Sequence, residues 1–230
     1  MHIPDGFIDG PTSLAGGVAA VGLVAASARK AAEGLEDRRV PLAGLTAAFI
    51  FAMQMLNFPV ANGTSGHLLG GCLAAILVGP WIGSLSMTVV FIVQALVFAD
   101  GGLSALGLNI ILMGFVPCFG GYAVFALLRK ILPDTRQAVA GASAVSAWTG
   151  VVMAAVVFTA YYAIGGTGDA SVTAVGGAVI GVHLLIGIGE AVITGLTVSA
   201  VLASRPDLVY GAASMYEQQQ PVARPAQAVR

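Results

Sequence analysis

Charged residues are scarce in this sequence. Only 9% of its 230 residues are Asp, Glu, Lys or Arg, whereas soluble globular domains carry about 25%. Hydrophobic residues make up 57% of the chain, so most of it is expected to lie in lipid. The formal net charge of −1 argues against a nucleic-acid-binding surface.

Cysteine and histidine are rare as well. The two cysteines, Cys72 and Cys118, lie within apolar runs and are expected to be small buried residues rather than a disulfide.

The chain does not begin with the basic and then apolar regions of a cleavable signal peptide. We therefore expect the translated N-terminus to be the mature one. Met1 should be retained, because His2 is larger than the second residues that favour its removal.

Long apolar runs predict helices that cross a membrane. A span needs about 20 residues, at 1.5 Å of rise per residue, to cross about 30 Å of hydrocarbon. Apolar segments are visible at 12–32, 41–58, 67–78, 80–98, 106–132, 138–164 and 172–204. The third is short, and only Gly79 and Pro80 separate it from the fourth, so these two could instead form one broken helix.

The basic residues decide between these alternatives. They lie around the first connection (Arg29, Lys30, Arg38, Arg39), around the fifth (Arg129, Lys130, Arg136) and in the tail (Arg205, Arg224, Arg230). Under the positive-inside rule these places are cytoplasmic. Seven segments satisfy the rule with the N-terminus outside and the tail inside, whereas six would put the fifth connection outside.

The sequence thus predicts an all-α integral protein of the cell (plasma or inner) membrane. It should have seven transmembrane helices with a short third helix, an extracytoplasmic N-terminus and a cytoplasmic C-terminus. Three regions follow: an N-terminal segment over 1–11, a membrane domain over 12–204, and a polar tail over 205–230 that should be disordered. The short third helix would leave a pocket mouth into which the N-terminal segment could insert.

Two of the three histidines, His2 and His67, fall on the outer side in this topology. His67 ends the glycine-rich stretch NFPVANGTSGH at the start of the third segment. By position alone, His2 could be a solvated terminal residue, and His67 could be hydrogen-bonded to its own loop. Their shared side of the membrane favours a joint role in binding a metal ion.

The first two residues provide three nitrogen donors. The α-amine of Met1 has a reference pKa of about 7.7–8.0 and loses its proton readily. This amine, the His2 amide nitrogen and His2 Nδ1 would close a five-membered and a six-membered ring around a divalent ion, and His67 could complete a square. Such sites suit Cu(II) and Ni(II), whereas Mg²⁺ and Ca²⁺ prefer oxygen ligands. Because the amide must lose its proton, binding should strengthen with pH.

Other polar residues have more than one interpretation. Asp5, Asn62, Thr64 and Ser65 could orient the ligating groups or could serve only in loop turns.

His183 and Glu190 are ionisable residues within the last segment. They are seven residues apart, so they share a helix face, and such residues usually face the interior of a membrane bundle. They could form a structural hydrogen-bonded pair, line the ion path or couple to a partner, or act as metal ligands.

Four motifs together resemble one family. They are MHIPDG at the start, GTSGHLLGG after the second segment, HLLIGIGEAVIT in the last segment and RPDLVYG after it. They are similar to the CbiM/NikM family, the substrate-binding components of cobalt and nickel energy-coupling-factor (ECF) transporters, over nearly the whole chain. The resemblance implies a seven-helix bundle with the N-terminal segment inserted from outside. It also implies a metal ion held by the Met1 amine, the His2 amide and imidazole nitrogens, and His67.

The resemblance implies partners as well: a transmembrane coupling (T) subunit, cytoplasmic ATPase (A) subunits and, in cobalt systems, often a small additional membrane subunit. The sequence agrees with a need for external energy, because it has no GxxxxGK(S/T) phosphate-binding loop. We therefore expect no enzyme activity in the chain itself. Co²⁺ or Ni²⁺ would be its transported substrate, and no permanent cofactor is expected.

We expect the substrate-binding component of an ECF-type ABC transporter, with cobalt for cobalamin biosynthesis preferred. Nickel is the alternative: a planar four-nitrogen site favours Ni(II), whereas the pattern around FIDGPTSL is more similar to cobalt members. A gradient-driven carrier acting alone, with Glu190 as proton relay, is a second hypothesis. An intramembrane enzyme using His183, Glu190 and Cys72 is a third, but no HExxH, GxSxG or pair of intramembrane acids supports it.

Overall fold

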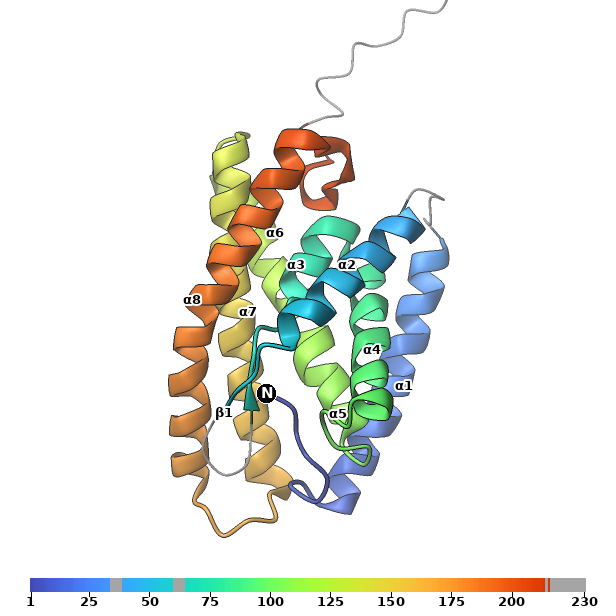
Figure 1. Cartoon of the computed structure of the whole chain (residues 1–230), viewed down its shortest axis with the longest axis vertical. Coiled ribbons are helices and arrows are strands. Elements are labelled where there is room, and N and C mark those ends of the chain that lie inside the picture. The colour runs from blue at the N-terminus through green and yellow to red at the C-terminus, as the bar shows by residue number, and fades with distance from the viewer. Residues whose placement is uncertain (34–38, 60–64, 214, 216–230) are drawn as a thin grey trace, which may run out of the picture.

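The uncharged apolar runs of the sequence form nearly all of the helices. In lipid every backbone N–H and C=O group must be hydrogen-bonded within the protein, and a helix achieves this within one segment. The structure, a computed structural model, describes residues 1–33, 39–59, 65–213 and 215. In this part of the chain, seven helices of two turns or more form one bundle (Figure 1). They are α1 (Gly10–Ala32), α2 (Arg39–Gln54), α3 (Gly71–Val78), α4 (Pro80–Val97), a continuous helix over 106–131, α7 (Arg136–Gly165) and α8 (Val172–Ser204).

Five of these helices are long and apolar enough to cross a membrane: α1, α4, the helix over 106–131, α7 and α8. α2 has 16 residues and α3 has 8, which correspond to about 24 Å and about 12 Å of helix at 1.5 Å per residue. Neither is long enough to cross about 30 Å of hydrocarbon perpendicularly. The chain is therefore a multi-pass membrane protein, and five of its seven predicted spanning helices meet the length criterion.

The helix over 106–131 changes its winding along its length. α5 (Leu106–Asn109) and α6 (Tyr122–Ile131) flank a π-helix, η2 (Ile110–Gly121), which contains Pro117. Proline cannot donate a backbone hydrogen bond, and such departures from the α-helical pattern accompany it. Cys118 in this helix and Cys72 in α3 are both buried and free, as predicted, and Cys118 Sγ donates to Gly71 O over 3.1 Å.

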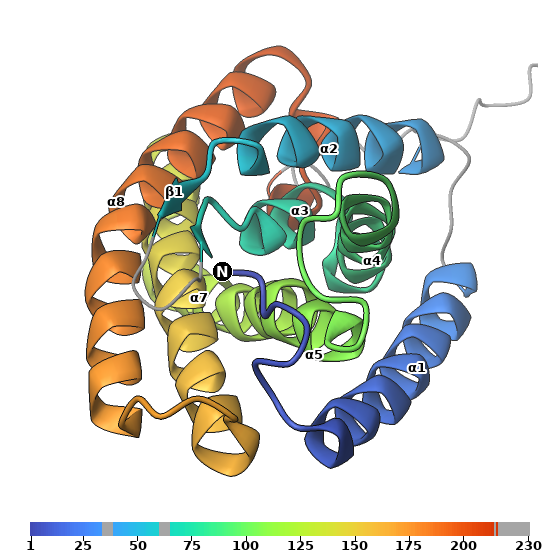
Figure 2. The ribbon, with the colours of Figure 1, turned by 60° about the horizontal axis from the view of Figure 1, so that its bottom comes forward.

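α3 lies at the centre of the bundle. All eight of its residues are buried, and Figure 2 shows it enclosed by the other helices. Its predicted start at residue 67 was wrong by four positions. Gly70 has a φ of +78°, in the left-handed region that glycine tolerates, so the helix can begin only after it. Residues 67–70 are therefore an irregular segment that carries His67 into the interior.

The second predicted segment, 41–58, also ends earlier than expected. α2 ends at Gln54, and the chain then forms β1 (Phe58–Pro59), which pairs antiparallel with β2 (Ser65–Gly66). β2 leads directly into the irregular segment 67–70, so this hairpin determines where His67 enters the bundle.

The first nine residues run from one end of the molecule into the bundle, and Figure 2 shows the N-terminus surrounded by helices. Backbone hydrogen bonds hold this segment: Gly102 N donates to Ile3 O over 2.9 Å, and Asp9 N donates to Gly165 O over 2.7 Å. Gly101 has a φ of +93°, and a Cβ there would lie 2.9 Å from the His2 ring. Met1 and Ile3 are fully buried.

The two ends of the bundle differ in charge. The C-terminal ends of α1 and α8 and the α6–α7 connection lie together at the top of Figure 1, while the N-terminal segment and the α4–α5 and α7–α8 connections lie toward the bottom. The top elements carry Arg29, Lys30, Arg129, Lys130, Arg136 and Arg205 together with the acidic Glu33, Asp134 and Asp207, whereas the charges of the bottom elements are the acidic Asp5, Asp9, Asp100 and Asp169. The fold thus brings the described basic clusters to one end.

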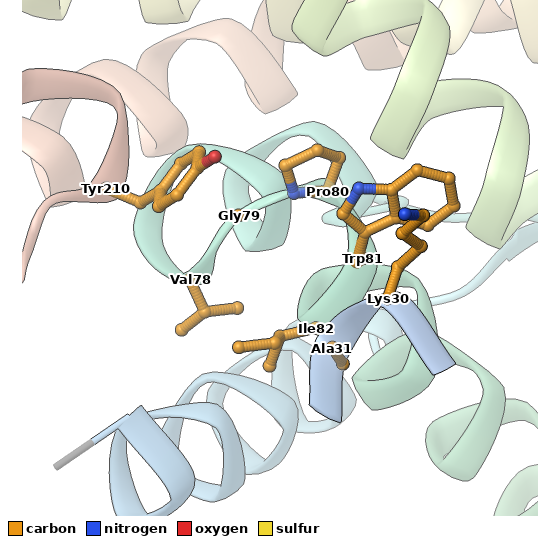
Figure 3. A pocket seen from close by; sticks show the side chains of 8 residues that line it. All are labelled: Lys30, Ala31, Val78, Gly79, Pro80, Trp81, Ile82 and Tyr210. Carbon is orange, nitrogen blue, oxygen red and sulfur yellow. The ribbon is translucent and has the colours of Figure 1, made fainter. Parts of the chain in front are cut away.

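Residues 206–212, which fall in the predicted disordered tail, have a defined structure. Two 3₁₀ turns, η3 (Pro206–Leu208) and η4 (Tyr210–Ala212), fold back onto the bundle because they bury Val209 and Ala212. Figure 3 shows Tyr210 near Gly79, on a cavity of about 120 Å³ beside the α3–α4 corner. The membrane domain therefore extends past the predicted boundary at 204, and residues 216–230 lie outside the described part.

Candidate metal centre

His2 and His67 meet inside the bundle. His2 Nδ1 lies 3.1 Å from His67 Nε2, and the two rings stack with centroids 4.6 Å apart. Both side chains are buried, and the Met1 amine lies within electrostatic range of both rings. The structure thus brings together the three predicted ligand residues and excludes a solvated position for His2.

A chain of amide side chains defines the tautomer of His2. Gln54 Nε2 donates to Leu69 O over 2.5 Å, and Gln94 Nε2 donates to Gln54 Oε1 over 2.8 Å. Gln94 Oε1 is then the acceptor facing His2 Nε2, 3.1 Å away. Because an amide oxygen can only accept, this contact assigns the proton of the neutral imidazole to Nε2 and the lone pair to Nδ1, although the Asp100 carboxylate oxygen Oδ1 competes for that proton from 3.3 Å on the Nδ1 side.

His67 is held in the complementary tautomer. Its Nδ1 lies 2.7 Å from the carbonyl oxygen of Leu68, so Nδ1 carries the proton and Nε2 the lone pair. The two nitrogens that carry lone pairs in this assignment, His2 Nδ1 and His67 Nε2, are therefore the ones that lie 3.1 Å apart. Two nitrogens in adjacent corners of a planar site, each about 2.0–2.1 Å from an ion, lie about 2.9 Å apart. The observed 3.1 Å is close to that separation, so the donor set fits a transition-metal ion.

The α-amine is also prepared to act as a donor. Burial lowers the pKa of the Met1 amine from 8.0 to about 4, although the carboxylate of Asp100 acts in the opposite direction. Burial, and then the neighbouring amine, lower the pKa of His2 from 6.5 to about 4. Both groups are therefore unprotonated at neutral pH and can donate lone pairs to an ion without first releasing protons.

Two side chains anchor the inserted N-terminal segment. Asn109 Oδ1 accepts from Ile3 N over 2.8 Å, and Asn109 Nδ2 donates to Ile3 O over 3.1 Å. Asp5 Oδ1 accepts from Ser104 Oγ over 2.6 Å and from Ser104 N over 2.8 Å, and these bonds lower the pKa of Asp5. Asp5 therefore holds the segment against the α4–α5 connection, one step removed from the histidines.

Glu190 holds the other half of the site. Its carboxylate accepts from Leu69 N over 2.8 Å and from Gly70 N over 2.6 Å. These amides belong to the irregular segment that carries His67. Glu190 on α8 thus fixes the backbone of a ligand-bearing segment, a structural role toward main chain rather than toward another side chain.

His183 lies on the same helix as Glu190, but only one of its two ring nitrogens has a hydrogen-bond partner among the described residues. Its Nδ1 lies 2.7 Å from Val179 O and so carries the proton. Its Nε2 is buried and has no hydrogen-bond partner among the described residues. A buried acceptor left without a donor costs about 1–3 kcal/mol.

The remaining predicted residues stay untested. Asn62 and Thr64 lie outside the described residues, and for Ser65 only the backbone, in β2, is described. No group of three or more His, Cys, Asp and Glu side chains suited to a metal ion occurs in the described ranges. That result is consistent with a site that depends on an α-amine and a backbone amide.

Sequence reasoning missed the two glutamines. Gln54 and Gln94 are uncharged, so they did not stand out in apolar segments, yet both are fully buried. Buried amides require hydrogen-bond partners, and a glutamine within a predicted span is therefore a usable signal of an internal polar network. That signal would have selected these residues but not their partners.

Known proteins share this architecture. Residues 2–208 match the family described as "CbiM: Cobalt uptake substrate-specific transmembrane region". The chain is 41% identical over 215 residues to a putative metal transport protein of Haloquadratum walsbyi, HQ_3621A, with 91% of this chain and 94% of the relative covered. It is 39% identical to the putative fused nickel transport protein NikMN of Archaeoglobus fulgidus, covering 91% of this chain and 68% of that protein.

The likeness extends to three dimensions. A crystal structure described as that of a truncated transition metal transporter superposes with a TM-score of 0.81 at 32% identity, covering 88% of this chain and 99% of the other. The family match spans most of the sequence, and the similar chains are named as metal transport proteins rather than enzymes. The chain therefore belongs to the CbiM family of membrane proteins for cobalt and nickel transport.

Proposed function

We propose that this chain is the substrate-binding component of an ECF-type uptake transporter and that its cargo is a divalent transition-metal ion. The observation that carries the proposal is the pair of imidazole nitrogens His2 Nδ1 and His67 Nε2, 3.1 Å apart in a buried site. Two buried acceptors without a donor between them are unfavourable, whereas a cation between them satisfies both.

The ion would be held by four nitrogens: the Met1 amine, the His2 amide, His2 Nδ1 and His67 Nε2. Three of the four belong to one N-terminal arm, and the fourth belongs to the segment held by Glu190. Because the amide must lose its proton, loading should release a proton and strengthen with pH. Capture or release would therefore require the arm and the segment to move apart.

Cobalt is the cargo that we propose first, because the matched family is described by cobalt uptake. Nickel is the alternative, supported by the Archaeoglobus relative named for nickel transport and by the preference of Ni(II) for planar nitrogen sites. Competition between Co²⁺ and Ni²⁺ for the purified protein, measured against cells that require one of the two metals, distinguishes them.

The binding site is tested by metal content. Protein purified with a native N-terminus and a C-terminal tag should retain about one ion per chain after dialysis. One extra residue before Met1 removes the amine from its place, and His67→Ala removes the fourth nitrogen. Each change should reduce bound metal severalfold or more, since loss of a ligand weakens a chelate strongly.

A matched control is Asp169→Asn, which changes a charge in the exposed α7–α8 connection and should leave the metal content unaltered. Undiminished metal in both the extended protein and His67→Ala would contradict the four-nitrogen site.

The proposed partners are a transmembrane coupling subunit, cytoplasmic ATPase subunits and a small additional membrane subunit. The absence of a phosphate-binding loop in the sequence supports a need for an external ATPase. The proposed orientation puts the basic end of the bundle in the cytoplasm, in accordance with the positive-inside rule, and the arm outside.

A further inference from the structure

His183 Nε2 is a buried hydrogen-bond acceptor for which the described residues provide no donor. The position of His183 along the bundle can be compared with that of Glu190, which lies seven residues, or about 10.5 Å, further along α8. Glu190 binds Gly70 N, and His67 lies three residues before Gly70, which is at most about 10 Å of chain. Leu68 packs near Gly189, so this segment runs beside α8 and can bring His67 to the depth of His183.

Electrostatics identify the neighbours of this ring. His183 lies within electrostatic range of the Met1 amine and of His67. The amine in turn lies within range of the Asp100 carboxylate. The Met1 amine thus interacts electrostatically with His67, His183 and the Asp100 carboxylate, although no hydrogen bond joins it to His183 Nε2 in the structure.

An amine that binds an ion through its lone pair keeps two N–H groups. In a buried site both need acceptors, because water cannot serve them. The Asp100 carboxylate can accept one, since an ionised carboxylate only accepts. His183 Nε2, whose proton is on the other ring nitrogen, is suited to accept the second.

We propose that His183 Nε2 accepts a hydrogen bond from the Met1 amine and thereby aims the amine lone pair at the ion. His183 is then a positioning residue that acts through Met1, and its role rests on the chelate proposed above. The bond would restrict the orientations that the Met1 amine can adopt at the start of the arm.

The test compares two substitutions in the full-length protein, with a native N-terminus and a C-terminal tag, titrated with Ni²⁺. His183→Gln keeps an acceptor oxygen and should keep most of the affinity. His183→Leu removes the acceptor at similar volume and should weaken binding about 10–100-fold, as loss of a group that orients a ligand typically does. The absorption spectrum of bound Ni²⁺ should be the same in His183→Gln as in the unaltered protein.

Thr194→Val is a matched control, because Thr194 Oγ1 is another buried, unbonded polar atom on α8. It should leave the affinity unchanged. If His183→Leu unfolds in detergent, His183→Met provides the same comparison with a flexible apolar side chain.

Full affinity in His183→Leu would overturn the inference. So would equal loss in both variants together with an altered Ni²⁺ spectrum in His183→Gln, because the imidazole would then be a ligand itself. A different result would contradict the chelate itself: an extra residue before Met1 would leave Ni²⁺ binding unaffected, both with His183 and with its substitutions.

Discussion

At the residue scale, the positions of single protons define the site. Gln94 holds the His2 proton on Nε2, and the Leu68 carbonyl holds the His67 proton on Nδ1. The two nitrogens left with lone pairs are those that lie 3.1 Å apart. In the proposed site, these donors would therefore be oriented before an ion arrives, which would reduce the free energy needed to order them at binding.

Gln94→Leu tests this arrangement. The variant leaves His2 Nε2–H without its acceptor, so the ring can turn or change tautomer. Affinity for Co²⁺ or Ni²⁺ should fall about 10–100-fold, as measured by titration of the purified protein.

Thr88→Val is the control for Gln94→Leu, because Thr88 is also buried on α4 but bonds only to Ser84 O of its own helix. It should bind the ion normally. An unaltered affinity in Gln94→Leu would show that the tautomer of His2 does not depend on Gln94.

Several residues of the proposed site could be predicted from the sequence, because two of them are covalently linked neighbours. Met1 and His2 are neighbours in the chain, so their chelate needs no fold to be recognised. Gln94 lies 92 residues from His2 and 40 from Gln54, and no local pattern connects such amides. His67 is an intermediate case, because its motif was recognisable while its contact with His2 was not.

At the element scale, the shortness of α3 creates the site. Gly70 ends any helical run before α3, and the four residues before Gly71 are free to bond with side chains instead of with each other. Glu190 takes up two of their amides, and Gln54 bonds to one of their carbonyls. Two helices, α2 and α8, therefore hold one irregular segment.

Glu190→Gln tests the hold on this segment. A glutamine oxygen accepts one backbone N–H, but its NH₂ group then faces the other N–H, so one buried donor loses its partner. The free energy of unfolding should fall by about 1–3 kcal/mol, and amide exchange at Leu69 and Gly70 should accelerate. Thermal unfolding and hydrogen exchange with mass spectrometry provide the two measurements.

Thr194→Val, one turn further along α8, is the control and should leave exchange in residues 67–70 unchanged. Unchanged exchange at Leu69 and Gly70 in Glu190→Gln as well would mean that α8 does not hold the segment through this carboxylate.

Helix boundaries could be predicted where an apolar run ends at the same residue as the helix. They were predicted less well where a polar contact ends the helix within an apolar run. α4 and α8 begin at the predicted residues, and α7 lies within two residues of its prediction at both ends. α2 ends four residues early, and α3 begins four residues late, both next to the hairpin of β1 and β2. Apolar side chains continue through these places, so hydropathy alone did not reveal the change of backbone.

At the scale of the whole molecule, the inserted arm and the basic end lie toward opposite ends of the bundle (Figure 1). An ion held by the arm is enclosed by helices, and α3 lies beyond it. Release toward the basic end would require a rearrangement of the bundle.

Uptake measurements test the proposed need for partner subunits. Radioactive Co²⁺ or Ni²⁺ should enter cells only when the chain is produced together with its coupling and ATPase subunits, because it has no phosphate-binding loop of its own. The chain alone should give background uptake, with or without an uncoupler of the proton gradient. Uptake by the chain alone that an uncoupler abolishes would support the gradient-driven carrier, with Glu190 as its proton relay.

The sequence by itself determined the membrane location and most of the helices, and it predicted the chelate of Met1 and His2. These properties depend on local composition and on covalent neighbours. Only the tertiary structure decided which groups face the ring nitrogens of His2 and His67, and that His183 Nε2 is buried without a hydrogen-bond partner among the described residues. Those properties depend on contacts between residues far apart in the chain, whose geometry is set by the packing of α2, α3, α4 and α8 around the inserted N-terminus.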